Sequence, residues 1–372
     1  MRSASTTSTD THALGVGTVN VVQIKQASWS PTWVSPAYRL GAISLVVTHL
    51  RHTWDTPETQ YAHYARCMTV LVFLDPAFFD GRIVDAHVPA IMATDQGVTR
   101  GDGIFESLLA VNGVPRKLQA HLDRLAGSAR SMQLTLPDAD IWKRAIATAL
   151  TTFVAASPQA PDEHGNTSVL IKLICTRGPE GEETPTAWVA ASAVSPVLAA
   201  QREKGLDVLL LDRGYESTIS SRAPWLLLGA KTLSYAVNMA ALRHAHANGG
   251  DDVIFISGDG QVLEGPTSSV LLAHVSNDGG KTLKRLITPS LDNGILPGTT
   301  QGALFAAAKD AGWELGYGPL EPRDLFDADA VWLISSIRLL APVNTIDGVE
   351  IGTADVRAAL TSELSALLAQ TH

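Results

Sequence analysis

From residue 68 to the C-terminus, β-prone runs alternate with segments of helical period, and this alternation restricts the chain to mixed folds. Two β-prone runs, 104–111 and 114–118, are separated by Asn112-Gly113. Both residues of this pair tolerate positive φ, so the pair favours a two-residue hairpin turn. Apolar residues then recur with helical spacing over 120–132. Because no regular βαβ repetition is present, the pattern predicts a mixed α/β (α+β) fold and not a doubly wound sheet.

The other expected elements fall on either side of segment 195–199, which contains Pro196 and which we interpret as a domain boundary. Before it we expect strands at 69–74, 82–84, 168–176 and 186–193, and a helix at 138–155. After it we expect strands at 206–211, 252–256, 261–263, 269–274 and 330–334, and helices at 233–247, 298–311 and 354–369. The sequence therefore predicts a small α/β domain at 68–193 and a larger one at 200–372.

Residues 1–67 fit neither domain. Residues 1–17 are rich in Ser, Thr and Gly, with little to bury, which predicts a poorly ordered extension. Trp and Tyr residues occur between there and Cys67, but without a sustained period. Two interpretations stay open: Met68 is the true start of the protein, or the segment is an ordinary variable extension.

Composition excludes several classes of partner. The formal net charge of −9 argues against nucleic acid or an anionic membrane surface, because both require clustered Lys and Arg. The two cysteines, Cys67 and Cys175, are too few for a disulfide framework and fit a reducing cytoplasm. No apolar run reaches the roughly 18 residues that span a bilayer, and no secretory signal pattern precedes the chain. We therefore expect a cytoplasmic protein that binds no membrane. The histidine pairs His49/His52 and His244/His246 have no supporting cluster of acids or cysteines, so we expect no metal site.

Two residues suggest chemistry on a cofactor ring. Lys231 follows an apolar run and precedes an expected helix, and burial there would lower the pKa of its amine and make it nucleophilic toward an aldehyde. Glu264 follows a tight turn and precedes Gly265-Pro266-Thr267. A carboxylate held there would keep a pyridine nitrogen protonated, so that the ring accepts electrons. Taken singly, each residue is better explained as a surface residue.

A third pattern suggests a phosphate site. Leu296-Pro297-Gly298-Thr299-Thr300 opens an expected helix, whose free N–H groups and two hydroxyls would bind an anion. Arg124 would add a two-pronged contact with the phosphate. Alone, these residues fit a helix cap and a surface arginine, but together with Lys231 and Glu264 they predict pyridoxal phosphate.

These motifs occur in the order found in the fold-type IV pyridoxal phosphate enzymes, and from about Met68 onward the chain resembles this class IV aminotransferase family. The resemblance is carried by Arg100-Gly-Asp-Gly-Ile-Phe-Glu106-Ser107, His121–Arg124, Lys231–Asn238, Glu264–Ser268 and Ile295–Thr300. It implies a two-domain architecture like that of D-amino-acid aminotransferase, with pyridoxal 5'-phosphate in the cleft between the domains. It also implies a homodimer in which a loop of the neighbouring small domain completes the substrate pocket.

The resemblance also implies roles for individual residues. Lys231 matches the lysine that carries the cofactor and moves the substrate proton, and Glu264 matches the carboxylate at the pyridine nitrogen. Phosphate contacts are implied for Arg124, Thr299 and Thr300, with Ser336 a weaker candidate. Tyr235 and Asn238 are expected to surround the lysine, and His121 is expected to belong to the scaffold.

The pattern is most similar to actinobacterial proteins of the aminodeoxychorismate lyase group, on the evidence of residues 231–240 and of 335–339 before Pro342-Val343. Both chemistries of the family begin with removal of the Cα proton. A lyase then expels a leaving group, giving 4-aminobenzoate and pyruvate for folate synthesis, whereas an aminotransferase passes the amine to an oxoacid. We favour the lyase over a branched-chain or D-amino-acid aminotransferase. A catalytically inactive cofactor-binding scaffold is a third hypothesis, against which the intact Lys231, Glu264 and Arg124 count.

Three residues are expected near a small anionic, amino-acid-like substrate: Glu106, Ser335 and Arg338. Arg338 suits a substrate carboxylate, although a salt-bridged structural arginine explains it equally well. Glu106 stands where some lyases have Thr, and Ser335 where many have Asn. These departures leave the substrate less well defined than the cofactor.

Overall fold

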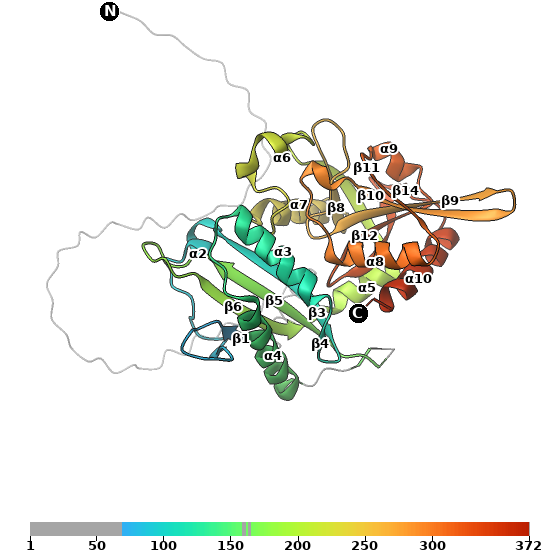
Figure 1. The fold of residues 1–372 in the computed structure, drawn as a ribbon. Helices are drawn as coiled ribbons and strands as arrows, with labels where there is room; N and C mark the ends of the chain where they lie inside the picture. The colour runs from blue at the N-terminus through green and yellow to red at the C-terminus, as the bar shows by residue number, and fades with distance from the viewer. Residues whose placement is uncertain (1–68, 158–160, 163–164, 372) are drawn as a thin grey trace, which may run out of the picture. The chain divides into compact units, whose positions relative to one another are not determined.

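The structure is a computed structural model that describes residues 69–157, 161–162 and 165–371 (Figure 1). The expectations for residues 1–67 and for Cys67 lie outside these described residues. In the described part, two β-sheets organise the chain, one formed before residue 194 and the other after residue 205.

The first sheet has six antiparallel strands in the order β2-β1-β6-β5-β3-β4. Its strands are β1 (Val70–Phe73), β2 (Arg82–Asp85), β3 (Gly103–Val111), β4 (Val114–Pro115), β5 (Ser168–Thr176) and β6 (Thr186–Ala193). The short helix α2 (Gln96–Arg100) precedes β3, and the long helices α3 (Leu118–Ser131) and α4 (Ala139–Ala156) pack against the sheet. Alternation along each strand therefore sends every second side chain into a core shared with these two helices.

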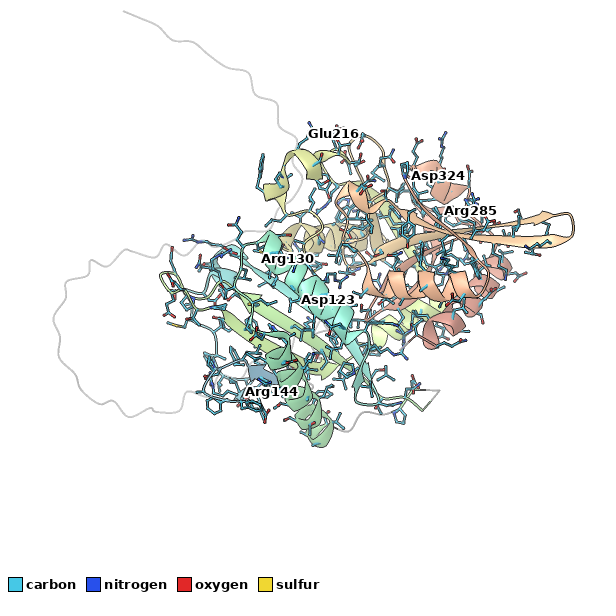
Figure 2. The ribbon with its side chains drawn as sticks, in the orientation of Figure 1. Asp123, Arg130, Arg144, Glu216, Arg285 and Asp324 are labelled. Carbon is cyan, nitrogen blue, oxygen red and sulfur yellow. The ribbon has the colours of Figure 1, made fainter. Side chains whose placement is uncertain are left out.

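Helices α3 and α4 are each apolar on the side that faces the sheet. On α3, Leu122 and Leu125 are buried while Asp123 and Arg130 are exposed (Figure 2). On α4, the guanidinium of Arg144 lies 4.1 Å from the Phe79 ring centroid and donates to the Phe79 carbonyl at 3.0 Å. This contact fastens the loop between β1 and β2 to the helix.

The second sheet is mixed and has the order β11-β10-β9-β12-β13-β7-β8, with β14 paired to β13. Its strands are β7 (Leu206–Asp212), β8 (Asp252–Ile256), β9 (Ser269–Asp278), β10 (Lys281–Pro289), β11 (Glu314–Gly318), β12 (Ala330–Ser335), β13 (Leu339–Ile346) and β14 (Val349–Glu350). The helices of this half are α5 (Pro196–Lys204), α6 (Ile219–Arg222), α7 (Ala236–Ala247), α8 (Thr299–Asp310), α9 (Pro322–Phe326) and α10 (Ala354–Ala369), with short 3₁₀ turns at Pro224–Leu226 and Leu291–Asn293.

Both faces of the second sheet are covered. Leu272 and Leu333 point into one core, and Leu271 and Trp332 point into the other, where α8 and α10 pack. Fully burying side chains of this size contributes roughly 1.5–3 kcal/mol each. The two layers therefore hold α8 firmly, and the N-terminus of α8 belongs to the site described below. Among the described residues, no helix combines the length and apolarity that crossing a membrane requires.

The predicted mixed α/β fold is confirmed, and several elements agree to the residue: the strands at 168–176, 186–193 and 252–256 and the helix at 354–369. The strand expected at 261–263 is wrong, because that segment makes only one isolated bridge, between Ile256 and Val262. The helix expected from 233 begins at Ala236, since the amide of Leu233 donates to Gly103 instead of starting a turn. The segment proposed as a boundary, 195–199, coincides with the start of α5, which packs on β13.

Candidate active site

Lys231 lies in a segment of the second half that pairs with strand β3 of the first sheet. The Phe105 amide donates to the Lys231 carbonyl at 3.1 Å, and the Leu233 amide donates to Gly103 at 2.8 Å. The Lys231 amide donates to the Ser128 hydroxyl of α3 at 3.0 Å. Backbone bonds on both sides therefore fix the root of the lysine side chain.

The Lys231 ammonium lies 4.3 Å from the centroid of the Phe105 ring and 5.6 Å from that of Tyr235. Burial lowers the pKa of Lys231 to about 8, since the charged form loses hydration. The carboxylates of Glu106 and Glu264 oppose this shift, whereas the Arg124 and Lys172 cations reinforce it. An amine in this state is partly neutral near physiological pH and can act as a nucleophile or a base.

Glu264 lies half-buried in the loop that follows Val262. Its Oε2 accepts a hydrogen bond of 3.1 Å from the Leu296 amide. Burial raises the pKa of Glu264 to about 7, although this hydrogen bond and the nearby cations favour the ionised form. A protonated nitrogen placed beside Glu264 would therefore form an ion pair with its carboxylate.

Helix α7 is joined to the loop that carries Glu264. Tyr235 Oη and Asn238 Nδ2 both donate to the Pro266 carbonyl, at 2.6 and 2.7 Å. Arg213 Nη2 donates to Asn238 Oδ1 at 3.0 Å. Burial raises the pKa of Tyr235 to about 12, so its hydroxyl stays a hydrogen-bond donor. The lysine and the glutamate are therefore held on one connected framework.

Glu106, His121 and Arg124 form a buried charged cluster. Glu106 is fully buried, and its two oxygens accept from Arg124 Nε at 2.7 Å and Arg124 Nη2 at 2.8 Å. His121 Nδ1 lies 2.7 Å from Glu106 Oε2. Burial alone would raise the pKa of Glu106, but the hydrogen bonds from Arg124 and His121 lower it to about 2. The carboxylate therefore stays ionised and fixes both neighbouring side chains.

Three hydroxyls gather beside this cluster, at the N-terminus of α8. Thr299 Oγ1 lies 3.1 Å from Ser336 Oγ, and Thr300 Oγ1 lies 2.9 Å from the same atom. His121 Nε2 lies 3.3 Å from both the Thr299 and the Ser336 hydroxyls. No side-chain hydrogen bond caps α8, and Thr299 and Thr300 are its first two residues, so two of these hydroxyls stand at its N-terminus. We call these hydroxyls, with His121 and the helix N-terminus, the hydroxyl cup.

The chain approaches the hydroxyl cup closely at Gly298. A side chain there would place its Cβ 2.5 Å from the Ser269 hydroxyl, so only glycine fits. Arg124 Nη1 donates to the Pro297 carbonyl at 2.7 Å and so joins α3 to this loop. A helix N-terminus, an arginine and several hydroxyls are the groups with which proteins bind doubly charged anions, and here they lie together.

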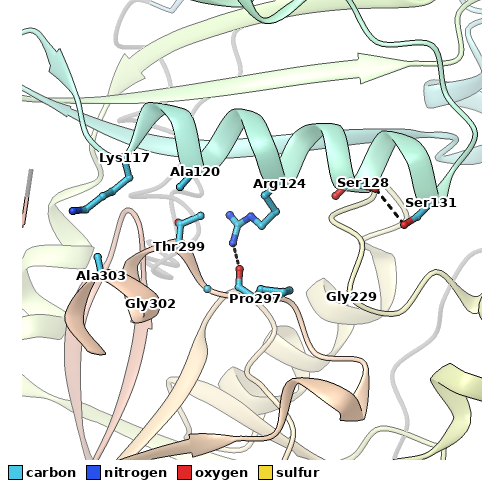
Figure 3. A pocket seen from close by; sticks show the side chains of 12 residues that line it. Lys117, Ala120, Arg124, Ser128, Ser131, Gly229, Pro297, Thr299, Gly302 and Ala303 are labelled. Atoms are coloured by element: carbon cyan, nitrogen blue, oxygen red, sulfur yellow. Dashed lines mark hydrogen bonds between the residues drawn. The ribbon is translucent and has the colours of Figure 1, made fainter. Parts of the chain in front are cut away.

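A groove of about 730 Å³ opens between α3 and α8 and reaches the cup from outside (Figure 3). Its lining includes Arg124 and Ser128 of α3, Pro297, and Thr299 and Gly302 of α8. Figure 3 shows the Arg124 side chain directed from α3 toward Pro297. Lys231 and Glu264 are not part of this lining, so the groove meets only the anion-binding end of the site.

Two residues expected to touch a substrate are placed differently. Glu106 uses both carboxylate oxygens inside the charged cluster. Arg338 is buried, with Nη2 2.6 Å from Asp252 and Nε 3.1 Å from Gln201 Oε1. A contact of Glu106 with a substrate stays a prediction, whereas the ion pair with Asp252 favours the salt-bridged alternative for Arg338. Ser335 accepts from the Arg338 amide at 3.2 Å, and its contact with a substrate stays a prediction.

The structure brings together Lys231, Arg124, Thr299, Thr300 and Ser336. The sequence patterns do not single out Phe105, although its ring contacts the lysine. Its position beside Glu106 in a β-prone run is the signal that could have placed it on the opposite face of the strand. A nucleophilic amine, a carboxyl group with a pKa of about 7 and an anion site are the groups that pyridoxal phosphate requires.

Comparisons with known proteins agree with this set of groups. The sequence profile of the family described as Amino-transferase class IV matches residues 103–346. The chain is 44% identical over 269 residues to a protein of Mycobacterium tuberculosis named bifunctional aminodeoxychorismate lyase / D-amino acid transaminase. That match covers 72% of this chain and 90% of the relative.

Comparison with solved structures also finds aminotransferases. A hypothetical aminotransferase from Mycobacterium tuberculosis, in its form bound to pyridoxal phosphate, matches with a TM-score of 0.72 and 39% identity, covering 82% of this chain and 98% of that one. A fold IV transaminase from Curtobacterium pusillum matches with a TM-score of 0.72 and 40% identity, over the same shares. The chain therefore belongs to the class IV aminotransferase family and is a pyridoxal phosphate enzyme, a lyase or a transaminase.

Proposed function

We propose that this protein is a 4-amino-4-deoxychorismate lyase that releases 4-aminobenzoate and pyruvate for folate synthesis. The observation that carries the proposal is the 44% identity, over 90% of its length, to a relative named for that lyase activity. The same relative is also named for D-amino-acid transamination, so a D-amino-acid transaminase activity of the same site is the second candidate. Both reactions need the same first step, removal of a proton beside the substrate nitrogen.

When bound, the cofactor supplies a pyridine ring that accepts electrons from the substrate carbon. Lys231 would hold the cofactor covalently through Nζ, and the same Nζ, when it is free, would accept the proton of the substrate. The pKa of about 8 suits this exchange, because the amine is then partly unprotonated near neutral pH. Phe105 and Tyr235 limit the directions in which the amine can swing.

Glu264 keeps the pyridine nitrogen protonated. Its own pKa of about 7 reflects burial, which outweighs the Leu296 hydrogen bond and the nearby cations, and a ring N–H⁺ beside it would favour the carboxylate. The Leu296 amide aims the carboxylate by binding Oε2 at 3.1 Å.

The hydroxyl cup and Arg124 bind the phosphate. In the structure the hydroxyls of Thr299 and Thr300 each bond to that of Ser336, and all three would be available to hold the phosphate. The Glu106 carboxylate positions both Arg124 and His121, so the cup is organised before the phosphate arrives. This placement lets the substrate chemistry occur at the opposite end, next to Lys231.

The remaining parts of the proposal concern the assembly. The protein is a cytoplasmic homodimer whose partner subunit completes the pocket for a small anionic amino substrate. The domains are 68–193 and 200–372, and α5 joins the second because it packs on β13. Light scattering coupled to size-exclusion chromatography tests the dimer, and a mass of one chain at micromolar concentration would contradict it.

One assay separates the two activities. Enzyme saturated with pyridoxal phosphate is given aminodeoxychorismate without any oxoacid, and 4-aminobenzoate and pyruvate are followed together. The lyase releases both in equal amounts over many turnovers. A parallel reaction contains D-alanine and 2-oxoglutarate, and a Lys231→Ala preparation serves as the blank.

Each outcome decides between the candidates. Equimolar release of the two products establishes the lyase, with or without D-alanine turnover. Conversion of D-alanine alone makes the protein a transaminase. If neither reaction occurs but borohydride still fixes the cofactor on the Lys231 peptide, the inactive cofactor-binding scaffold is correct.

A further inference from the structure

His121 lies between the buried carboxylate of Glu106 and the hydroxyls of the cup. It belongs to α3, and its side chain is only 1% exposed, so each ring nitrogen needs a hydrogen-bond partner within the protein. Nδ1 lies 2.7 Å from Glu106 Oε2, and Nε2 lies 3.3 Å from the hydroxyl oxygens of both Thr299 and Ser336. The ring therefore connects a fixed negative charge to the hydroxyls at the start of α8.

The proton on Nδ1 is fixed by Glu106. Although burial raises the pKa of Glu106, hydrogen bonds from Arg124 and His121 lower it to about 2, so the carboxylate is ionised and can only accept hydrogen bonds. Nδ1 must therefore donate. A neutral imidazole carries a single N–H group, so Nε2 of the neutral ring can only accept. The neutral ring consequently uses the proton of one hydroxyl, that of Thr299 or that of Ser336.

The hydroxyl cup has too few protons for a neutral ring and a bound anion together. Thr299, Thr300 and Ser336 supply one hydroxyl proton each. Among the described residues, four contacts join these hydroxyls and Nε2, two between hydroxyls and two to the ring. An anion that accepts from all three hydroxyls takes every one of these protons, which leaves Nε2 of the neutral ring facing only oxygen lone pairs. A ring protonated on Nε2 donates to the hydroxyl oxygens instead, so that every group has a partner.

The charges around the ring also depend on whether an anion is present. Glu106 is negative and its partner Arg124 is positive, and a small cavity beside the ring is lined by Arg116 and Lys117. Burial and the charge of Arg116 lower the pKa of Lys117, as expected for cations held close together. Without an anion, three cations oppose a proton on His121 and one carboxylate favours it. A dianion in the cup adds two negative charges on the Nε2 side, which favours the imidazolium.

The neighbouring elements bring no further charge to this cavity within the described part of the chain. Its remaining lining residues, which come from β3, α8, α10 and the segment between β12 and β13, are Leu109, Thr300, Ser336, Leu339, Leu368 and Thr371. The protonation of the ring therefore depends on Glu106, on the three cations and on whatever occupies the cup.

We propose that His121 takes up a proton from solvent when the phosphate of the cofactor enters the hydroxyl cup. The imidazolium then donates from Nδ1 to Glu106 and from Nε2 to the hydroxyl oxygens, which turns the three hydroxyl protons toward the phosphate. His121 is thus a positioning residue that acts on the phosphate through Thr299 and Ser336. The inference rests on the proposed function only for the assignment of the phosphate to the cup. Because the bound state carries the extra proton, anion affinity falls as pH rises.

The first test counts the protons that are taken up when sulfate binds. Sulfate stays a dianion over the range in which an imidazole titrates, so it contributes no proton of its own. Full-length apoenzyme is titrated with sulfate by calorimetry at constant ionic strength, in buffers that differ in their heat of ionisation. The dependence of the measured heat on the buffer gives the number of protons exchanged. We expect up to about one proton per sulfate near neutral pH, and an affinity that falls by up to about tenfold per pH unit.

The variant His121→Gln removes the titratable ring but keeps a polar side chain, and His121→Asn serves if the first variant does not fold. Either variant should take up less than about 0.3 proton per sulfate and should bind sulfate with an affinity that depends little on pH. His244→Gln is the matched control, because His244 is exposed near the end of α7, and it should behave as wild type. Equal proton uptake in the wild type and in the His121 variants would overturn the proposal.

Nitrogen-15 NMR of the histidine rings gives a readout that a purely structural role would not move. When sulfate is added, Nε2 of one ring should change from the shift of an unprotonated nitrogen to that of an N–H group. This signal should be missing from His121→Gln. A His121 ring that already carries both protons without sulfate, or that stays neutral with sulfate bound, would contradict the proposal.

Competition with pyridoxal phosphate separates this inference from the proposed function. If sulfate competes with the cofactor for apoenzyme but binds without proton uptake, the role of His121 is wrong and the phosphate still belongs to the cup. If sulfate binds without competing, the phosphate lies elsewhere, and both the assignment of the cup and this inference are wrong. The choice between lyase and transaminase is decided separately, by the assay with aminodeoxychorismate.

Discussion

The two ends of the site differ in how completely their side chains are paired. At the phosphate end, Glu106, His121, Arg124 and the hydroxyls of the cup use nearly every polar atom on one another. At the substrate end, next to Lys231, the ammonium of Lys172 on β5 is exposed and makes no hydrogen bond or ion pair within the described residues. The difference indicates that cofactor binding is organised in advance, whereas substrate choice depends on a few exposed groups.

The free-energy cost of a substitution therefore differs between the two ends of the site. Removing one partner from a buried charged cluster leaves an uncompensated charge, which costs roughly 3–5 kcal/mol. Removing an exposed lysine costs little stability, because water already solvates it. Substitutions at the phosphate end should therefore affect cofactor affinity and folding, and those at the substrate end should affect only the choice of substrate.

The largest expected effect is that of Lys231→Ala. Turnover should fall by about 10³-fold or more, because the variant lacks both the covalent attachment of the cofactor and the base. Steady-state rates, with borohydride reduction and mass analysis of the 231 peptide, measure both losses. Lys143→Ala, a surface lysine paired with Asp140, is the control. A rate within tenfold of wild type would show that another group moves the proton.

Glu106→Gln should have the next largest effect. The variant keeps the shape but leaves Arg124 and His121 without their shared carboxylate. We expect cofactor affinity to fall about 10- to 100-fold and the free energy of unfolding to fall by about 3 kcal/mol. Fluorescence titration of apoenzyme with pyridoxal phosphate and urea unfolding measure the two losses.

The control for Glu106→Gln is Glu314→Gln in the exposed pair with Arg285. If D-alanine turnover at saturating cofactor falls while cofactor affinity stays at the wild-type value, Glu106 acts on the substrate after all. The claim that substitutions at the phosphate end act through cofactor affinity and folding would then be wrong.

The sequence predicts those site residues whose surroundings come from neighbouring residues in the chain. It does not predict contacts between residues that lie far apart in the chain. Lys231, Glu264 and Thr299 are recognisable because each stands in a short segment whose neighbours restrict the backbone. The partners of Glu106 and Arg338 are not recognisable, because strand register and sheet order bring them together. Arg338 meets Asp252 through sheet contacts that no local pattern encodes.

The same reasoning explains the missed strands. Lys281, Lys284 and Arg285 interrupt the apolar alternation of β10, which pairs with β9 on one side and β11 on the other. β11 contains Gly316 and Gly318, and β13 contains Pro342, residues that weaken a strand prediction. Tertiary pairing overrides these local preferences.

A third prediction uses the pKa of Lys231, about 8, on which burial acts first and then the charges of Glu106, Arg124, Glu264 and Lys172. Only the neutral amine attacks the aldehyde, so the rate at which apoenzyme captures pyridoxal phosphate should rise about tenfold per pH unit below pH 8. Above it the rate should level off. Stopped-flow absorbance measures this rate. Division by the rate of free Nα-acetyl-lysine at each pH removes the cofactor's own titration, and because that free amine has a pKa of about 10.4, the normalised rate should be constant below pH 8 and fall about tenfold per pH unit above it.

The variant Lys172→Met tests whether a neighbouring charge contributes to the lowered pKa of Lys231. Removing a neighbouring cation should raise the pKa of Lys231 and move the midpoint of the rate profile to higher pH. A normalised rate that does not change between about pH 6 and 9 would show that the lysine is not depressed by burial. If the midpoint does not move in Lys172→Met, the charge of Lys172 does not affect the pKa of Lys231.

The smallest expected effect belongs to the exposed pair of Arg100 and Glu180, whose side chains are 58% and 65% exposed. Glu180→Gln should change the free energy of unfolding by less than about 1 kcal/mol, because water screens such pairs. It should leave KM for D-glutamate unchanged as well, since the pair touches neither end of the site. Urea unfolding and steady-state kinetics measure both quantities. A rise in KM would mean that the loop between β5 and β6, which carries Glu180, contributes to substrate binding.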